Sequence, residues 1–346
     1  EASAEESIAL TLECLDLLEH DPRYFTTSNA VRDLDRVRDA LGYEELNIYG
    51  VSYGTRVAQQ YMRVYPERAR AAILDGLAPA SIALGPDTAL ESQKALDALF
   101  ERCETDTACS SAFPDFRDQF YGLIDRLDAE SVEVTFTHPR SGATTTFPFG
   151  RATLAGAVRL LIYSPTTSSM LPVLINEAAR GHFEPLAALA SSTAESIGEM
   201  AQGLNFSVLC TEDAPYWGSI DRAAQAETYM GSVFMDVLLE VCKTWPKGPM
   251  DTGFKTALES DIPTLILTGE FDPITPARYV PFAAPHLTNH IEVLAKGQGH
   301  GMLAIGCIPQ LMSKFIDEPD PRALDVSCAE RITAFPLFTS PLGPAP

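Results

Sequence analysis

Apolar residues recur at helical spacing in two stretches near the start of the chain. The first stretch predicts a helix over residues 5–20. In the second, Thr27 or Ser28 can cap the start of a helix and Gly42 suits the C′ position that ends it. The apolar positions that define the two helices are Ile8, Leu12, Leu15 and Leu18, then Val31, Leu34, Val37 and Leu41.

Two short apolar runs of a different kind follow these helices. Residues 46–52 read LNIYGVS and residues 70–76 read RAAILDG, and both have the length and composition of buried strands. Between them, residues 56–69 have a helical pattern that stops near Pro66. Helix–strand–helix–strand with short connections predicts a mostly parallel α/β sheet flanked by helices.

The pattern changes from about residue 85 to residue 260, where nearly every segment has helical period apart from one expected hairpin. The α/β pattern then returns, with strands in LILTGEFDPITP and HIEVLAKGQGHG and a helix at LMSKFID, before a Pro-rich tail that we expect to be extended. We therefore predict that residues 1–84 and 261–346 together form an α/β core, and that residues 85–260 form a mostly helical cap inserted into it.

A serine lies between two glycines where the first predicted strand meets a helix. Gly50-Val51-Ser52-Tyr53-Gly54 fits the pattern G-x-S-x-G, in which the serine adopts strained backbone angles and side chains at the glycines would collide with neighbouring backbone. The helix that follows directs its free N–H groups at the same place. Ser52 is therefore the candidate nucleophile, and the N–H of Tyr53 is the candidate oxyanion donor.

The serine needs a base, and the base needs an acid that orients it. Of the six histidines, His300 alone follows an apolar strand in a Gly-rich loop, where sites in parallel sheets assemble. Asp272 also follows a strand, and the order Ser52, Asp272, His300 is that of an α/β hydrolase. The alternative acid is Asp75, at the end of the second strand.

Three segments together resemble the proline iminopeptidase and tripeptidyl aminopeptidase family of α/β-hydrolase serine exopeptidases. They are residues 24–76, LILTGEFDPITP and GQGHG, and the resemblance covers nearly the whole chain, with a C-terminal domain of the tripeptidyl aminopeptidase kind. It implies an α/β-hydrolase fold in which Ser52 is the nucleophile, Asp272 the orienting acid and His300 the general base.

The resemblance also implies that the helical segment is a cap that binds the ammonium group of a peptide with a free N-terminus. Carboxylates must then face a partly dry pocket. Glu212 and Asp213 in LCTEDAPYW are the candidates, with Glu270 as a further substrate-facing acid. The alternative is that the adjacent acids only cap a helix start.

The chain departs from the resemblance at its start. Relatives carry an upstream segment with the first strands of the sheet and a Gly-rich loop that donates the second oxyanion N–H, and no such loop occurs in this sequence. The strand at 46–52, normally central, is therefore expected to have an unpaired edge, which a missing N-terminal segment or chain would cover. That segment would also offer a cysteine as partner for Cys14.

Composition and charge limit the kinds of ligand that this chain is expected to bind. The chain has 46% hydrophobic and 21% charged residues, as globular proteins do, and 47 Asp and Glu against 25 Lys and Arg give a net charge of −22. Such a surface repels phosphate backbones and anionic lipid, and no apolar run could span a bilayer, so we expect neither nucleic-acid nor membrane binding. No His or Cys spacing resembles a metal site and no phosphate loop is present, so we expect no metal and no cofactor.

The seven cysteines bear on the compartment. Three local pairs would leave Cys14 alone, although spacing does not exclude that all seven are reduced and buried. Disulfides would favour a periplasmic or secreted protein. The candidate pairs are Cys103 with Cys109, Cys210 with Cys242, and Cys307 with Cys328.

Three functions remain open at this stage. The first is a serine aminopeptidase that releases proline or a short peptide from an N-terminus through an acyl-enzyme. The second is an esterase or lipase-like hydrolase, whose cap would lack convergent carboxylates. The third is a non-catalytic hydrolase fragment that needs a partner segment, because the fold alone decides no chemistry.

Overall fold

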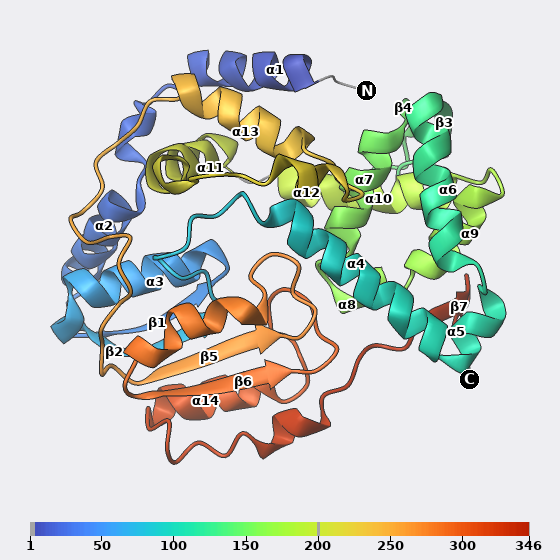
Figure 1. Cartoon of the computed structure of the whole chain (residues 1–346). Coiled ribbons are helices and arrows are strands. Elements are labelled where there is room, and N and C mark those ends of the chain that lie inside the picture. Colours follow the sequence, from blue (N-terminus) through green and yellow to red (C-terminus); the bar gives the residue numbers. More distant parts are fainter. Residues whose placement is uncertain (1–3, 199–200, 346) are drawn as a thin grey trace.

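A four-stranded parallel sheet joins the early and late segments of the chain in the computed structural model, which describes residues 4–198 and 201–345 (Figure 1). The strand order is β1-β2-β5-β6, with every neighbouring pair parallel. The apolar runs of the sequence form these strands, and β5 is buried along its whole length. Their bounds are β1 Leu46–Val51, β2 Ala69–Asp75, β5 Thr264–Gly269 and β6 His290–Ala295.

Helices cover both faces of this sheet, as the alternating pattern of the sequence predicts. α2 (Thr27–Ala40) and α3 (Tyr53–Val64) pack on one face around Val31, Tyr61 and Met62. α14 (Ile308–Asp317) packs on the other face through Ile308, Leu311 and Phe315, as Figure 1 shows below the sheet. This is the doubly covered parallel sheet of the α/β class.

The start of α2 lies one residue earlier than expected. Thr26, rather than Thr27 or Ser28, is the N-cap, since its extended backbone lets Oγ1 accept from the N–H of Asn29. Gly42 does end the helix at C′, with φ of +75°. The first helix is also shorter than predicted, because α1 (Ala4–Asp16) ends before the polar residues that precede Pro22.

One edge of the sheet is formed by β1, which pairs only with β2 among the described residues. The expected apolar face of the second helix is also only partly buried: Val37 is 54% exposed, and Leu41, the C-cap residue of α2, is 64% exposed. On β1 itself, Tyr49 and Val51 are 39% and 41% exposed. This edge has the exposed apolar character that the sequence predicts for it.

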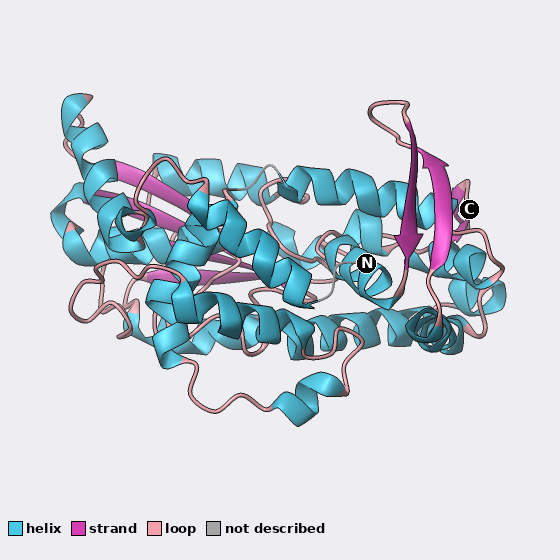
Figure 2. Cartoon of the chain, turned by 90° about the horizontal axis from the view of Figure 1, so that it is seen from above, coloured by secondary structure: helices cyan, strands magenta, loops and turns pink. Residues whose placement is uncertain are grey.

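The middle of the chain is mostly helical and has its own core of phenylalanines and leucines, among them Phe100, Phe120 and Phe149. The expected hairpin is β3 (Val132–Thr137) with β4 (Thr144–Phe149), which Figure 2 shows at the end of the molecule away from the sheet. The helices are α4 Thr88–Thr105, α5 Thr107–Ala112, α6 Phe116–Ala129, α7 Arg151–Leu161, α8 Pro165–Ser168, α9 Leu171–Ala179, α10 Glu184–Gly198, α11 Gln202–Val208, α12 Arg222–Ala226 and α13 Val233–Thr244.

Several short elements complete the chain. The tail forms a small antiparallel pair, β7 (Phe338–Ser340) with β8 (Gly343–Pro344), and the N–H of Phe338 donates to the Ser169 carbonyl in the helical region. α1 packs beside α13, with Ile8 and Leu15 against the buried cluster that includes Leu238, Val241 and Trp245. One π-helical turn covers Leu209–Asp213, and single 3₁₀ segments cover Pro22–Tyr24, Pro66–Arg68, Ala214–Tyr216, Ala277–Phe282, Ala284–His286 and Ser327–Arg331.

All three candidate disulfides are formed, and the alternative of seven reduced cysteines is wrong. The pairs are Cys103–Cys109, Cys210–Cys242 and Cys307–Cys328, and they leave Cys14 as the free cysteine of the described chain. None of the helices described is both long and apolar enough to cross a bilayer.

Candidate active site

Ser52 occupies a strained turn between β1 and α3. Its φ of +57° and ψ of −123° make it the only non-glycine residue with positive φ in the described chain. The turn brings Gly50 against the next helix, so that a Cβ there would lie 2.2 Å from the Gly54 carbonyl oxygen. The predicted collision therefore holds for Gly50 but is wrong for Gly54, where a Cβ would meet nothing within 4 Å among the described atoms.

The N-terminus of α3 lies directly after the serine. Tyr53 is the first residue of this helix, and its N–H has no acceptor among the described residues. An N–H in this position carries the positive end of the helix dipole. The geometry is that of a donor available to an oxyanion, as the sequence predicts for Tyr53.

His300 and Asp272 are brought together from loops that follow β6 and β5. His300 Nδ1 lies 2.8 Å from Asp272 Oδ2, and the Asp272 side chain is fully buried. The other oxygen, Asp272 Oδ1, accepts from the backbone N–H groups of Ile274 and Thr275 at 2.8 Å each. Thr275 Oγ1 also donates to Oδ2 at 2.8 Å. Such a carboxylate can hold the imidazole with its proton on Nδ1 and leave Nε2 to act as a base.

The nucleophile lies beside this pair. In the sheet, Val51 is in register with Asp75. The N–H of Ser52 donates to the Asp75 carbonyl at 2.8 Å, and this places Ser52 beside Gly76, the next residue of the neighbouring strand end. A Cβ on Gly76 would lie 3.1 Å from His300 Cε1. No hydrogen bond joins Ser52 Oγ to His300 in the described stretches of the chain, and such bonds are often loose before substrate binds.

The alternative acid, Asp75, does not orient His300. Its carboxylate is fully buried and accepts from the N–H of Met302, at 2.8 Å to each oxygen, and from the Tyr49 hydroxyl at 2.9 Å. Burial raises the pKa of Asp75. The Asp75 side chain therefore joins the loop just after His300 to the end of β2. Its role is structural, next to the pair of His300 and Asp272.

Glu212 belongs to the π-helical turn, and its side chain is buried against the start of α2. Its Oε1 accepts from the N–H of Thr27 at 2.7 Å, and its Oε2 accepts from Thr27 Oγ1 at 2.9 Å. Thr27 Oγ1 lies 2.7 Å from the Tyr53 hydroxyl, so a hydrogen-bond chain leads from Glu212 to the residue after the nucleophile. Burial raises the pKa of Glu212 to about 7.

Asp213 already has two cationic partners. Its carboxylate receives both hydrogen bonds of Arg56 Nη1, at 3.0 and 2.8 Å, and lies 3.0 Å from Lys255 Nζ. Asp213 and Arg56 are fully buried. Burial lowers the pKa of Lys255. Asp213 therefore joins the π-helical turn to α3 in a buried ion pair.

The alternative that these acids cap a helix start agrees with the contacts of Glu212 and not with those of Asp213. Asp213 precedes the 3₁₀ segment Ala214–Tyr216 without a capping hydrogen bond. Glu212 instead satisfies a free N–H in the first turn of α2, which lies 185 residues earlier in the sequence. Thr27, Arg56 and Lys255 have no local sequence signal that would pair them with these acids.

Glu270 has different partners from the other two acids. It is exposed and accepts from the N–H of Gly297 at 2.8 Å. No hydrogen bond or ion pair of the described residues joins it to Glu212 or Asp213. Among the described residues, Glu270 thus shares no hydrogen-bond or ion-pair partner with the other two carboxylates proposed for the ammonium group.

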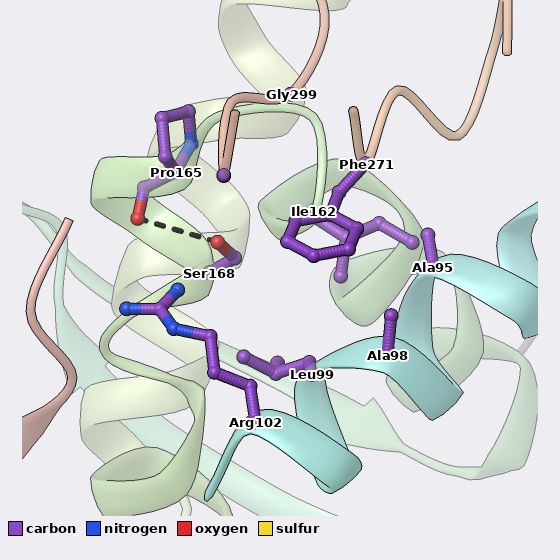
Figure 3. Close-up of a pocket in the computed structure, with 10 residues that line it drawn as sticks. Ala95, Ala98, Leu99, Arg102, Ile162, Pro165, Ser168, Phe271 and Gly299 are labelled. Atoms are coloured by element: carbon purple, nitrogen blue, oxygen red, sulfur yellow. Dashed lines mark hydrogen bonds between the residues drawn. The ribbon is translucent and has the colours of Figure 1, made fainter. Parts of the chain in front are cut away.

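A small cavity lies behind the acid and histidine loops (Figure 3). Phe271 and Gly299, the neighbours of Asp272 and His300, line it together with Leu99 and Arg102 of α4 and Ile162 after α7. Its volume is about 30 Å³, which is room for a water molecule and not for a peptide. No group of three or more His, Cys, Asp or Glu side chains among the described residues is placed to hold a metal ion.

Comparison with known proteins agrees with this geometry. Residues 12–112 match the family model described as alpha/beta hydrolase fold, and residues 227–328 match the one described as TAP-like protein. The parallel sheet and the serine turn define an α/β hydrolase of the serine-hydrolase and peptidase kind. Within that class, the chain is similar to proteins of the TAP-like kind, since residues 227–328 match that model and a stretch of 54 residues is similar to a tripeptidyl aminopeptidase.

Three relatives illustrate the range of similarity. Serine protease Hip1 of Mycobacterium tuberculosis is 28% identical over 273 residues, which are 72% of this chain and 51% of Hip1. Tripeptidyl aminopeptidase of Streptomyces lividans is 43% identical over 54 residues, 16% of this chain and 10% of that protein. Putative hydrolase YuaR of Escherichia coli is 25% identical and covers 88% of this chain and 63% of YuaR. This chain thus spans about half the length of Hip1.

Proposed function

We propose that this chain carries the catalytic residues of a serine peptidase that removes N-terminal residues from peptides. In this proposal Ser52 attacks the scissile carbonyl, His300 takes the serine proton and returns it to the leaving amine, and Asp272 orients the imidazole. The N–H of Tyr53 stabilises the oxyanion. The hydrogen bond of 2.8 Å between His300 and Asp272, beside a serine with positive φ, is the observation that carries the proposal.

The preference for a free N-terminus is supported by the family and by Glu212. Glu212 is a buried acid whose hydrogen-bond chain ends at Tyr53, the residue after the nucleophile. An ammonium group beside it would favour its ionised form and pair with it. Asp213 is a weaker candidate, since Arg56 and Lys255 already neutralise it, and Glu270 is exposed and has no contact that links it to the nucleophile among the described residues. We therefore assign the amine contact to Glu212.

The disulfides support a proposal about the compartment in which the protein works. Three disulfides in one chain favour an oxidising compartment, and we propose the periplasm or the exterior of the cell. The expected partners are a peptide with a free N-terminus and a further segment that covers the β1 edge and supplies the second oxyanion donor.

Burst kinetics test the proposal. The chain is mixed with an activated ester and with a prolyl or alanyl arylamide, beside the Ser52→Ala variant. We expect a stoichiometric burst with the ester, absent in the variant, followed by turnover of the arylamide with a free amine but not of its N-acetylated form. Equal turnover of the acetylated arylamide would refute the exopeptidase assignment. A burst on the ester alone would indicate an esterase or an incomplete oxyanion hole, and no burst would refute catalysis by this chain.

A further inference from the structure

One arginine in the cap lacks the partners that the other buried arginines have. Arg159, near the end of α7, is half-buried, and its Nε is fully shielded from solvent without a hydrogen-bond acceptor. Every other arginine of the described chain that is not exposed donates a hydrogen bond or forms an ion pair. In a chain with 47 acidic residues, a half-buried guanidinium without a carboxylate calls for an explanation.

Two aromatic rings hold this guanidinium in place. Arg159 Cζ lies 5.6 Å from the centre of the Tyr163 ring and 5.5 Å from that of Phe234 on α13. Contacts at this distance stabilise the cation and orient its flat face, but they leave the N–H groups at its edge without acceptors. The buried hydroxyl of Tyr229 is close enough for the charge of Arg159 to act on its pKa. The cap thus presents donors without acceptors at this place.

Tyr163 connects the guanidinium to the candidate catalytic histidine. Its ring packs edge-to-face on His300 with centres 5.6 Å apart, and its carbonyl accepts from the N–H of His300 at 2.8 Å. The guanidinium is therefore no further from the imidazole than the sum of two separations of 5.6 Å. An extended peptide covers that length in about three residues.

We propose that Arg159 binds a carboxylate of the substrate within about three residues of the scissile bond. A guanidinium between two rings offers a fork of donors that matches a carboxylate, and a partly buried site strengthens the interaction. The carboxylate is either the C-terminus of a short peptide or an acidic side chain. This inference deepens the proposed function and rests on it for the position of the scissile bond.

Calorimetry in a Ser52→Ala background tests the inference independently of turnover. One pair of probes is tetra-alanine with a free C-terminal carboxylate and its C-terminal amide. The second pair is amidated tetra-alanine carrying Glu or Gln at each position in turn. We expect the acid of at least one pair to bind about ten- to a hundredfold more tightly than its neutral match. That preference should disappear in Arg159→Gln and persist in Arg151→Gln, a half-buried arginine of the same helix that pairs with Asp128.

The outcomes separate the inference from the proposed function. If the free acid of the first pair binds more tightly than its amide, Arg159 binds the C-terminal carboxylate. If a Glu peptide of the second pair binds more tightly than its Gln match, Arg159 binds an acidic side chain. If both forms bind equally, if neither binds, or if the preference survives Arg159→Gln, the inference is wrong. Arg159→Met, which keeps the apolar contact with the two rings, must lose the same preference. A carboxylate preference in a chain that shows no burst would leave the Arg159 site standing and refute the peptidase proposal.

Discussion

Replacing Glu212 by Gln should change how the stability of the protein depends on pH. The Glu212 side chain is fully buried and is held by the N–H and Oγ1 of Thr27. A glutamine keeps the size of the side chain and one acceptor for the N–H, and the Thr27 hydroxyl can turn to accept from the amide. The variant therefore removes the ionisation of this group while it preserves most of the packing.

The size of the effect follows from the pKa of the buried acid. Burial raises the pKa of Glu212 from 4.5 to about 7, because the charged form loses its water and the hydrogen bonds from Thr27 only partly replace it. In the unfolded chain the group ionises near its ordinary pKa of 4.5. Between these values the folded state binds the proton and the unfolded state does not. The stabilisation is thus complete below pH 4.5 and is lost as the pH rises through about 7. At about 1.4 kcal/mol for each pH unit, the total is roughly 3 kcal/mol.

Urea unfolding at pH 5 and pH 8 measures this contribution. Other carboxylates change the stability of both proteins alike, so the quantity of interest is the stability of Glu212→Gln minus that of the wild type. We expect this difference to increase by roughly 2–3 kcal/mol in favour of the variant from pH 5 to pH 8. The exposed Glu67→Gln variant is the matched control and should show no such increase. A difference that stays constant, or that moves in favour of the wild type as the pH rises, would refute the assignment of a buried acid that resists ionisation.

The remaining predictions concern two other buried carboxylates. Asp213→Asn leaves the buried Arg56 guanidinium without its counter-charge, and we expect the free energy of unfolding to fall by roughly 3–5 kcal/mol in urea titrations. A loss below about 1 kcal/mol would contradict a buried pair and place the interaction in the range of exposed ones. Asp272→Asn keeps the shape of the side chain but favours the wrong tautomer of His300, so kcat on an arylamide should fall on the order of ten-thousandfold. Activity within tenfold of the wild type would exclude Asp272 as the orienting acid.

The sheet and the histidine–aspartate pair could be predicted from the sequence because both depend on local signals. Apolar runs bounded by turn residues locate β1, β2, β5 and β6. The carboxyl ends of parallel strands meet at one edge, so acids and histidines placed just after strands come together there. The order of the residues does not separate Asp272 from Asp75, since both lie between Ser52 and His300. The hydrogen bond of His300 to Asp272 separates them.

The surroundings of Glu212 and Asp213 could not be predicted, because their partners lie far away in sequence. Thr27 is 185 residues and Arg56 157 residues from the acid that it contacts. Helical period places both acids in a cap segment but cannot say which face of the π-helical turn meets α2 or α3. The cap of α2 illustrates a finer limit: Thr26 and Thr27 are chemically equal, and only the extended backbone at Thr26 selects it.

Two adjacent acids of the cap thus hold the region of the molecule that presents the nucleophile. Glu212 contacts the start of α2, and Asp213 contacts Arg56, one turn into the helix that begins after Ser52. Moving this cap segment away from α3 would leave a buried guanidinium unpaired, at a cost of roughly 3–5 kcal/mol. A free hinge at Leu209–Asp213 is therefore disfavoured, and the wall of the site on this side is set in the folded protein before substrate binds. A preformed wall can present a binding group to a substrate without a separate closing step.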